Sequence, residues 1–341
     1  MREHKLIPDI PHSRPWISDE DRAAVDAVLR VGMIACGRRV VEFEAACAEY
    51  LDARYVETCD SGESALLRAL QLLRLEQGAS VVVPTYVCSS VASAVKRAGL
   101  VPFFCDIGED WCMTEETVGR VFNTSVAAIV AVHIFGIKVD VAAFKKFGVP
   151  IIEDCAQCFT NEVGQLGDVA IYSFSATKCL TCGEGGLVVI PGASPVTANT
   201  LKGSASSRIS DLQAVLGLSQ LARYDQMLKR RQEIALSYLS VLPEVVLERT
   251  RRIQSVSIFF RFPLFFAEGF DHVAPKFWAQ GVAVRRGVDA VLHRRCGLED
   301  RSFPNAVAAL DCTVSLPCYP SMSNQDVDRV KNSVLKVLNE L

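Results

Sequence analysis

The chain has 341 residues, of which 50% are hydrophobic and 22% are charged, and its formal net charge is −3. This length is enough for one large domain and a smaller one, each with a core of its own. Acidic and basic residues are interspersed, which argues against a nucleic-acid-binding face and against an acidic tail. No apolar run is long enough to span a bilayer, so we expect neither nucleic acid nor a membrane as a partner.

The cysteine count is high and odd, at thirteen. The charged N-terminal residues lead into no apolar segment of signal-peptide length, so we expect a cytoplasmic protein. A reducing cytosol keeps thiols free, and free cysteines are commonly buried. We therefore expect structural thiols and no disulfide framework.

The predicted elements alternate along most of the chain. An acidic stretch after Ser18 is typical of a helix start, and the first helices are predicted over residues 23–29 and 41–50. Strands are then predicted over residues 81–84, 101–105, 127–132, 150–152, 169–174 and 186–190, and helices over 64–75, 89–98 and 141–147. This alternation predicts βαβ units, and hence an α/β fold with a mostly parallel sheet flanked by helices.

The last third of the chain has a different pattern. Residues 211–242 have helical spacing, as one long helix or two in tandem, and are followed by a predicted strand over 256–266 and helices over 271–280 and 325–341. We predict an N-terminal arm (1–20), a large α/β domain (21–225) and a small C-terminal α+β domain (226–341).

Four segments follow predicted strands, where ligands bind on parallel sheets. They are residues 60–64 (DSGES), 153–157 (EDCAQ), 173–178 (SFSATK) and 183–186 (GEGG). The helix start after Ser61 suits a phosphate, although an ordinary helix cap explains it equally well. A carboxylate buried at a strand end needs a partner, and a protonated pyridine nitrogen or a salt bridge would supply one. A desolvated Lys178 could be a nucleophilic amine, whereas a lone lysine in a loop is usually solvated.

In this order and spacing, the segments resemble the DegT/StrS group of sugar aminotransferases, which are fold type I pyridoxal-phosphate (PLP) enzymes. The likeness runs from about residue 13 to the C-terminal helix and includes residues 37–44, 83–86, 133–136, 211–214 and 315–317. The resemblance implies a fold type I aminotransferase-like large domain with a mostly parallel seven-stranded sheet. It also implies a homodimer with active sites at the interface.

The resemblance further implies a role for each matched residue. Lys178 would be the catalytic residue that holds PLP as a Schiff base, Asp154 would pair with the pyridine nitrogen, and Gln157 would lie near the ring. The remaining implied cofactor contacts are Gly62, Glu63, Ser64 and Ser173 for the phosphate and Tyr86 for ring stacking. Related sugar dehydratases carry a histidine in place of the lysine, so Lys178 favours transamination.

The resemblance implies transfer of an amino group, usually from glutamate, to a keto-sugar that is expected to be nucleotide-linked. A cyclitol or another natural-product ketone stays open as the acceptor. We expect His133 and Arg208 to contact the substrate.

Two departures from the family pattern bear on these expectations. Glu63 stands where threonine is usual, and we expect its carboxylate to turn away from the phosphate because like charges repel. The segment 191–210 is short, and Ser206 and Ser207 stand near the position of an asparagine that reaches the partner subunit's phosphate in the family.

The cysteines offer a competing interpretation. Cys155 and Cys158, then Cys179 and Cys182, are spaced like a four-cysteine zinc site, which would indicate a metal-binding or redox-sensing protein. Each pair overlaps a segment assigned to PLP, and a zinc knuckle would draw those segments away from the strand ends. We therefore expect structural thiols and no metal.

Overall fold

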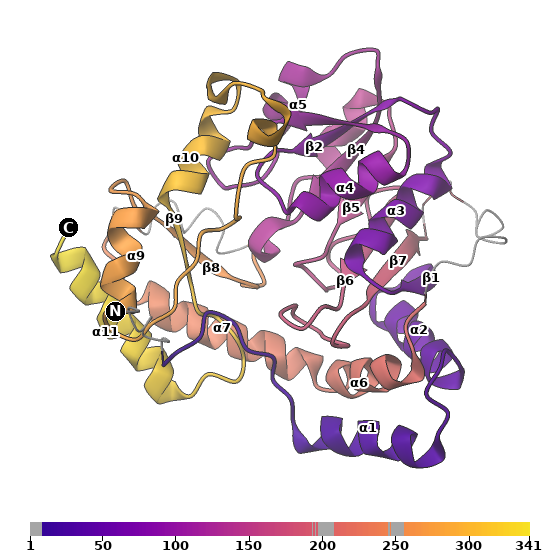
Figure 1. Cartoon of the computed structure of the whole chain (residues 1–341), viewed down its shortest axis with the longest axis horizontal. Helices are drawn as coiled ribbons and strands as arrows, with labels where there is room; N and C mark the ends of the chain where they lie inside the picture. The colour runs from indigo at the N-terminus through magenta and orange to yellow at the C-terminus, as the bar shows by residue number, and fades with distance from the viewer. Residues whose placement is uncertain (1–8, 193, 195, 197–207, 245, 247–255) are drawn as a thin grey trace, which may run out of the picture.

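The computed structural model describes residues 9–192, 194, 196, 208–244, 246 and 256–341 (Figure 1). The helices are α1 (Asp19–Val31), α2 (Arg38–Tyr50), α3 (Gly62–Leu73), α4 (Ser89–Arg97), α5 (Glu115–Val121), α6 (Asp211–Leu221), α7 (Tyr224–Leu239), α9 (Phe270–Trp278), α10 (Pro304–Cys312) and α11 (Asn324–Asn339). The strands are β1 (Ala53–Cys59), β2 (Ser80–Pro84), β3 (Val101–Cys105), β4 (Val126–Val132), β5 (Ile151–Asp154), β6 (Val169–Ser173), β7 (Gly186–Pro191), β8 (Phe262–Phe265) and β9 (Thr313–Leu316).

The large sheet has seven strands in the order β1-β7-β6-β5-β4-β2-β3 within the described residues. Strand β7 runs antiparallel to both of its neighbours, β1 and β6, and the other pairs are parallel. The predicted α/β fold with a mostly parallel sheet is therefore confirmed. The carboxyl ends of all strands except β7 consequently lie at one edge.

Two hydrophobic cores cover the two faces of this sheet. Along β6, Ile171 packs into one core with α3 and α4, whereas Ala170 and Tyr172 pack into the other with α2 and α6. Alternation of side chains across a strand places helices on both faces (Figure 1). The predicted helical segment 211–242 forms two helices in tandem, α6 and α7.

A third core lies at the other end of the molecule. It joins α7, the antiparallel pair β8 and β9, α9 and α11, together with Ile10 of the N-terminal arm. The division into an arm and two domains stays a prediction, and its boundary at residue 225 lies inside α7. In the described part of the chain, no helix combines the length and apolar character that a membrane crossing requires.

The predicted strand over 256–266 is largely wrong. Only Phe262–Phe265 forms a strand, because β8 pairs with β9 over these four residues, while Ser257 makes a single bridge to Ile137. Elements α5, α10 and β9 were not predicted. Residues of α10 pack into the core of the large sheet although α10 lies far along the chain, and a local pattern cannot show that long-range contact.

Candidate functional site

The candidate active site is a cavity of about 340 Å³ at the carboxyl edge of the large sheet. Its walls come from the ends of β4, β5 and β6, the start of α3 and the loop before α4. The residues that line it are Ser61, Gly62, Glu63, Leu66, Val87, Cys88, Ser90, Val91, Val132, His133, Asp154, Ala156, Gln157, Ile171, Ser173, Ser175, Thr177, Lys178 and Glu184. Three of the four segments singled out in the sequence thus contribute several wall residues, and the fourth contributes Glu184.

Lys178 lies in the turn that follows β6. Its backbone N–H donates to the carbonyl of Ser175 at 2.9 Å, which closes the turn, and its Nζ lies 5.5 Å from the centre of the Phe260 ring. Burial lowers the pKa of Lys178, and the charge of Asp154 opposes that shift only in part. A lysine with a lowered pKa is neutral more often and therefore more nucleophilic.

Asp154 is the last residue of β5, and its carboxylate lines the cavity. Its Oδ1 accepts a hydrogen bond from the backbone N–H of Ala156 at 3.0 Å. Burial raises the pKa of Asp154, because that one hydrogen bond and the charge of Lys178 do not offset the loss of water. An additional cationic donor in the cavity would stabilise this carboxylate.

The neighbouring carboxylate, Glu153, points to the opposite face of β5 and is fully hydrogen-bonded. Its Oε1 accepts from the backbone N–H groups of Leu166 (2.8 Å) and Gly167 (2.6 Å), and its Oε2 accepts from Gly164 (2.8 Å). Its Oε2 also lies 3.1 Å from His133 Nε2. Burial acts to raise the pKa of Glu153, but these hydrogen bonds outweigh it and lower the pKa.

The bonding of His133 fixes its tautomer. Nδ1 accepts a hydrogen bond from the backbone N–H of Val139 at 3.1 Å, so Nε2 carries the proton that it donates to Glu153. Both ring nitrogens are therefore committed to the protein. His133 lines the cavity as predicted, but it can contact a substrate only through a ring face or edge.

The start of α3 forms the wall nearest β6. The Ser61 side chain accepts from the backbone N–H of Ser64 at 3.2 Å and caps the helix. Gly62 is required there, since a Cβ would lie 2.8 Å from Ser173 Cβ. This close approach brings the free N–H groups of the first turn next to the Ser173 hydroxyl, an arrangement that suits an anion.

Gln157 and Glu63 both line the cavity, as predicted, and both have protein partners. Gln157 Oε1 accepts from the backbone N–H of Phe135 at 2.7 Å, which leaves its NH₂ group as a donor. The Glu63 carboxylate accepts from Ser93 (2.7 Å) and from Arg97 (2.9 Å) on α4. Arg97 therefore balances the charge of Glu63. We expected the Glu63 carboxylate to turn away from the phosphate, and its two partners lie on α4.

Three predicted contacts are not among the residues that line this cavity. Tyr86 is not among the lining residues; its ring is buried edge-on against Phe135. Ser64 is also absent from the lining, and its N–H and hydroxyl are both hydrogen-bonded to Ser61. Arg208 forms an ion pair with Glu44 and does not line the cavity.

The lining residues that were not named as contacts from the sequence include Cys88 and Ser61. Cys88, the residue before α4, occupies the wall where Tyr86 was expected, and its exposed thiol accepts from Ser90 at 3.2 Å. The family resemblance named Tyr86 for this wall, while the start of α4 at Ser89 was predicted correctly. Ser61 lies in the segment 60–64 that the sequence singled out, although it was not named as a cofactor contact. Ser206 and Ser207 lie outside the described residues.

The cysteine pairs do not form a four-thiol site. Cys155, Cys158, Cys179 and Cys182 are buried in the core between α2 and β6, and burial raises the pKa of each thiol. Within the described ranges, the one group of three potential metal ligands is His133, Glu153 and Cys155. The hydrogen bonds of His133 and Glu153 already occupy the atoms that a metal would need, so this group is a satisfied polar network.

The chain matches the DegT/DnrJ/EryC1/StrS aminotransferase family over residues 15–202 and 192–335. It is 29% identical over 259 residues to GDP-perosamine synthase of Vibrio cholerae, covering 68% of this chain and 71% of that protein. It is 28% identical over 370 residues to dTDP-4-dehydro-2,3,6-trideoxy-D-glucose 4-aminotransferase of Saccharopolyspora spinosa, covering 95% and 96%.

Among solved structures, Spr1654 from Streptococcus pneumoniae is named as a sugar aminotransferase and was determined in PMP and PLP forms. The two forms superpose on this chain with TM-scores of 0.87 and 0.86 at 20% and 21% identity. They cover 97% of this chain, and 100% and 99% of theirs. The superposition confirms the fold type I aminotransferase-like architecture.

Proposed function

The chain belongs to the DegT/DnrJ/EryC1/StrS aminotransferase family and is a PLP-dependent aminotransferase that acts on a keto-sugar, and we propose that glutamate donates the amino group. The acceptor is then a nucleotide-linked keto-sugar, and Lys178 is the residue at which the transfer takes place. The observation that carries the site assignment is the pairing of Lys178 and Asp154 in one cavity. Their pKa values move toward each other, since burial lowers that of Lys178 and raises that of Asp154.

The residues of the cavity fit PLP. Asp154 would hold the pyridine nitrogen, because its buried carboxylate has a raised pKa and accommodates a cationic N–H donor. Ser173 and the N–H groups at the start of α3 would hold the phosphate. Gln157 has its NH₂ group free to donate to the ring oxygen. Bound PLP supplies an electron sink for the charge that develops at the donor's α-carbon.

The chain's own residues would then perform two tasks. Lys178 Nζ would take the proton from the donor's α-carbon as a base and then return it to the cofactor carbon as an acid. Its lowered pKa keeps the amine available as a base. Asp154 would keep the pyridine nitrogen protonated throughout, and the hydrogen-bonded Glu153 and His133 would hold the strand ends in place.

The acceptor assignment draws on the relatives. The names of two relatives, GDP-perosamine synthase and the dTDP-linked 4-aminotransferase, each include a nucleotide. The second relative matches 95% of this chain. The cavity opens beside several arginines (Arg261, Arg285 and Arg295), which suit the phosphates of a nucleotide-linked sugar. A cyclitol or another ketone without phosphate would leave these charges without a substrate partner.

We also propose a homodimer, with each active site at the subunit interface, in the cytoplasm. Exposed apolar side chains gather at the end of α1 and in the loop before α2, namely Leu29, Val31, Met33 and Ile34. Apolar patches of this kind mark protein interfaces. All thirteen cysteines are free, as a reducing compartment requires. Sedimentation of wild type and Val31→Asp would test the dimer, since a monomeric wild type contradicts it.

The central experiment is a visible spectrum of the protein after incubation with PLP. Wild type should show the absorption band of lysine-bound cofactor, and glutamate should bleach it. Lys178→Ala should lose that band and at least 10⁴-fold in amino transfer. The exposed Arg22→Gln on α1 is the control and should behave as wild type. A wild-type protein without the band would overturn the site assignment, and a band that glutamate leaves unchanged would overturn the donor.

A further inference from the structure

Beside Lys178, on the side away from α3, lies a second cavity of about 200 Å³ whose walls are strongly cationic. It shares Lys178, Gln157 and Cys88 with the cofactor cavity. Four arginines line it, namely Arg261, Arg285, Arg286 and Arg295, against the single carboxylate of Asp289. An excess of positive charge next to Lys178 favours an anionic ligand in this cavity.

Arg261 is the arginine closest to the interior. In the described part of the chain it has no ion pair, and its Nη1 donates a hydrogen bond to the carbonyl of Gly287 at 3.2 Å. Its guanidinium lies 5.5 Å from the centre of the Phe260 ring, and Lys178 Nζ lies 5.5 Å from the same ring. Burial and the charge of Arg285 both lower the pKa of Arg261, a sign of an uncompensated cation.

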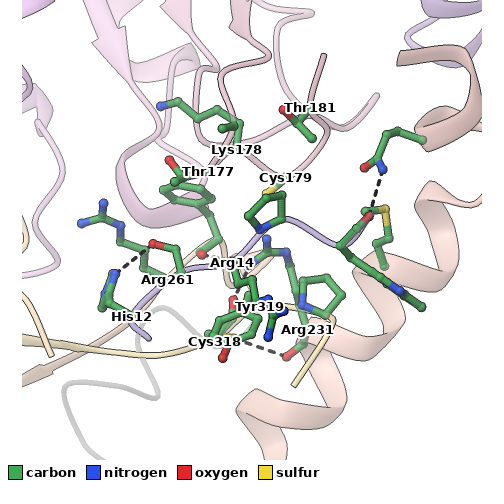
Figure 2. Close-up of a pocket in the computed structure, with 18 of the residues that line it drawn as sticks. His12, Arg14, Thr177, Lys178, Cys179, Thr181, Arg231, Arg261, Cys318 and Tyr319 are labelled. Atoms are coloured by element: carbon green, nitrogen blue, oxygen red, sulfur yellow. Dashed lines mark hydrogen bonds between the residues drawn. The ribbon is translucent and has the colours of Figure 1, made fainter. Parts of the chain in front are cut away.

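The surroundings of Arg261 confirm this positive field. Arg261 also lines a small pocket with Lys178 and with His12 of the N-terminal arm; Figure 2 shows Arg261 beside His12, with Lys178 above. Burial, followed by the charges of Arg261 and Arg285, lowers the pKa of His12 to about 3. His12 is therefore neutral and adds no charge. Arg286, by contrast, is paired with Asp271 at 2.6 Å.

We propose that Arg261 is a specificity-determining residue that binds an oxyanion of the substrate beside Lys178, with Arg285 and Arg295 forming the outer wall of the same subsite. The proposal rests on the proposed function, because Lys178 defines the reacting atom. The oxyanion has two possible sources with one chemistry: a carboxylate of the amino donor, or a phosphate of the nucleotide-linked acceptor. In either case a guanidinium offers paired donors to two oxygens.

The test measures anion binding directly, by calorimetry on PLP-loaded protein, with glutarate and inorganic pyrophosphate as unreactive probes. Arg261→Gln should weaken the binding of at least one probe by about tenfold to a hundredfold, the range for a hydrogen bond to a charged group. Arg261→Lys keeps the charge and should recover part of the loss. Arg301→Gln is the matched control, since Arg301 is exposed and paired with Glu299 outside the cavity.

The outcomes separate the two sources. Weaker glutarate binding alone assigns Arg261 to the donor, and weaker pyrophosphate binding alone assigns it to the acceptor. Equal losses in Arg261→Gln and Arg261→Lys would indicate a structural effect and overturn the proposal. So would unchanged binding of both probes, or no binding by wild type. The calorimetric readout does not depend on turnover, so failure of amino transfer would contradict the proposed function and not this subsite.

Discussion

The two faces of β5 place two adjacent carboxylates in opposite situations. Glu153 is 1% exposed and accepts hydrogen bonds on both oxygens, whereas Asp154 is 5% exposed, faces the cavity and accepts one from Ala156. Their pKa values consequently move in opposite directions, downward for Glu153 and upward for Asp154. Both belong to one five-residue segment that the sequence marked as a unit, and the pleat of the strand separates their functions.

This contrast shows how a fold supports a reactive group. Glu153 lowers the energy of the folded state because its charge is fully hydrogen-bonded by the loop 164–167 and His133. Asp154 raises the energy of the cofactor-free fold because its charge lacks a strong partner. A site that keeps one carboxylate unsatisfied next to a fully satisfied one is prepared for a cationic group.

The largest expected effect comes from Asp154→Asn. An amide cannot hold a protonated pyridine nitrogen, so amino transfer should fall by about a thousandfold. The stability of the cofactor-free protein should stay the same or rise, because the substitution removes a poorly solvated charge. Single-turnover kinetics and urea denaturation of cofactor-free protein measure the two effects. A large loss of stability would show that Asp154 has a structural role instead.

A smaller effect, of the opposite kind, is expected from Glu153→Gln. The amide NH₂ would face backbone N–H donors, so unfolding free energy should fall by about 2–4 kcal/mol. Activity at a permissive temperature should stay within about tenfold of wild type, since Glu153 does not line the cavity. Urea denaturation and steady-state kinetics check both. If Glu153→Gln loses activity as fully as Asp154→Asn, the assignment of the two faces is wrong.

The smallest expected effect is the pH dependence of the stability differences between wild type and the two variants. The folded pKa of Glu153 is below its ordinary value of 4.5, so its stabilisation is present above pH 4.5 and is lost as pH falls through the folded pKa. The advantage of wild type over Glu153→Gln should therefore shrink in acid. Asp154 has a raised pKa, so any gain from Asp154→Asn should be present at neutral pH and vanish below its ordinary pKa of 3.8.

Denaturation midpoints of cofactor-free protein between pH 3.5 and 7.5 would follow both trends. Parallel pH profiles for the two variants would show that the carboxylates share one environment.

Much of the site could be predicted because its residues lie next to strand ends. Asp154, Ser173 and Lys178 follow apolar runs whose carboxyl ends must meet at one edge of a parallel sheet. Gly62 was located by its place at a helix start, and the close approach to Ser173 explains why that place needs glycine. The family resemblance added the role of each residue.

The predicted contacts that do not line the cavity depended on side-chain direction. Tyr86 and Cys88 lie two residues apart in the same loop, and only the local backbone decides which of them faces the cavity. Arg208 pairs with Glu44, a partner 164 positions away in the chain. Arg261 was not selected at all, because a single arginine in an expected strand carries no local signal.

The sequence alone determined the alternation of strands and helices and the edge at which the site forms, because both follow from short-range patterns. Its resemblance to the family marked the lysine at the centre of the site. Only the tertiary structure decided which carboxylate of β5 is structural and which faces the cofactor cavity. It also decided that Arg261, the residue before β8, lies beside Lys178. Such choices depend on burial and on hydrogen-bond partners from distant segments, which exist only once the chain has folded.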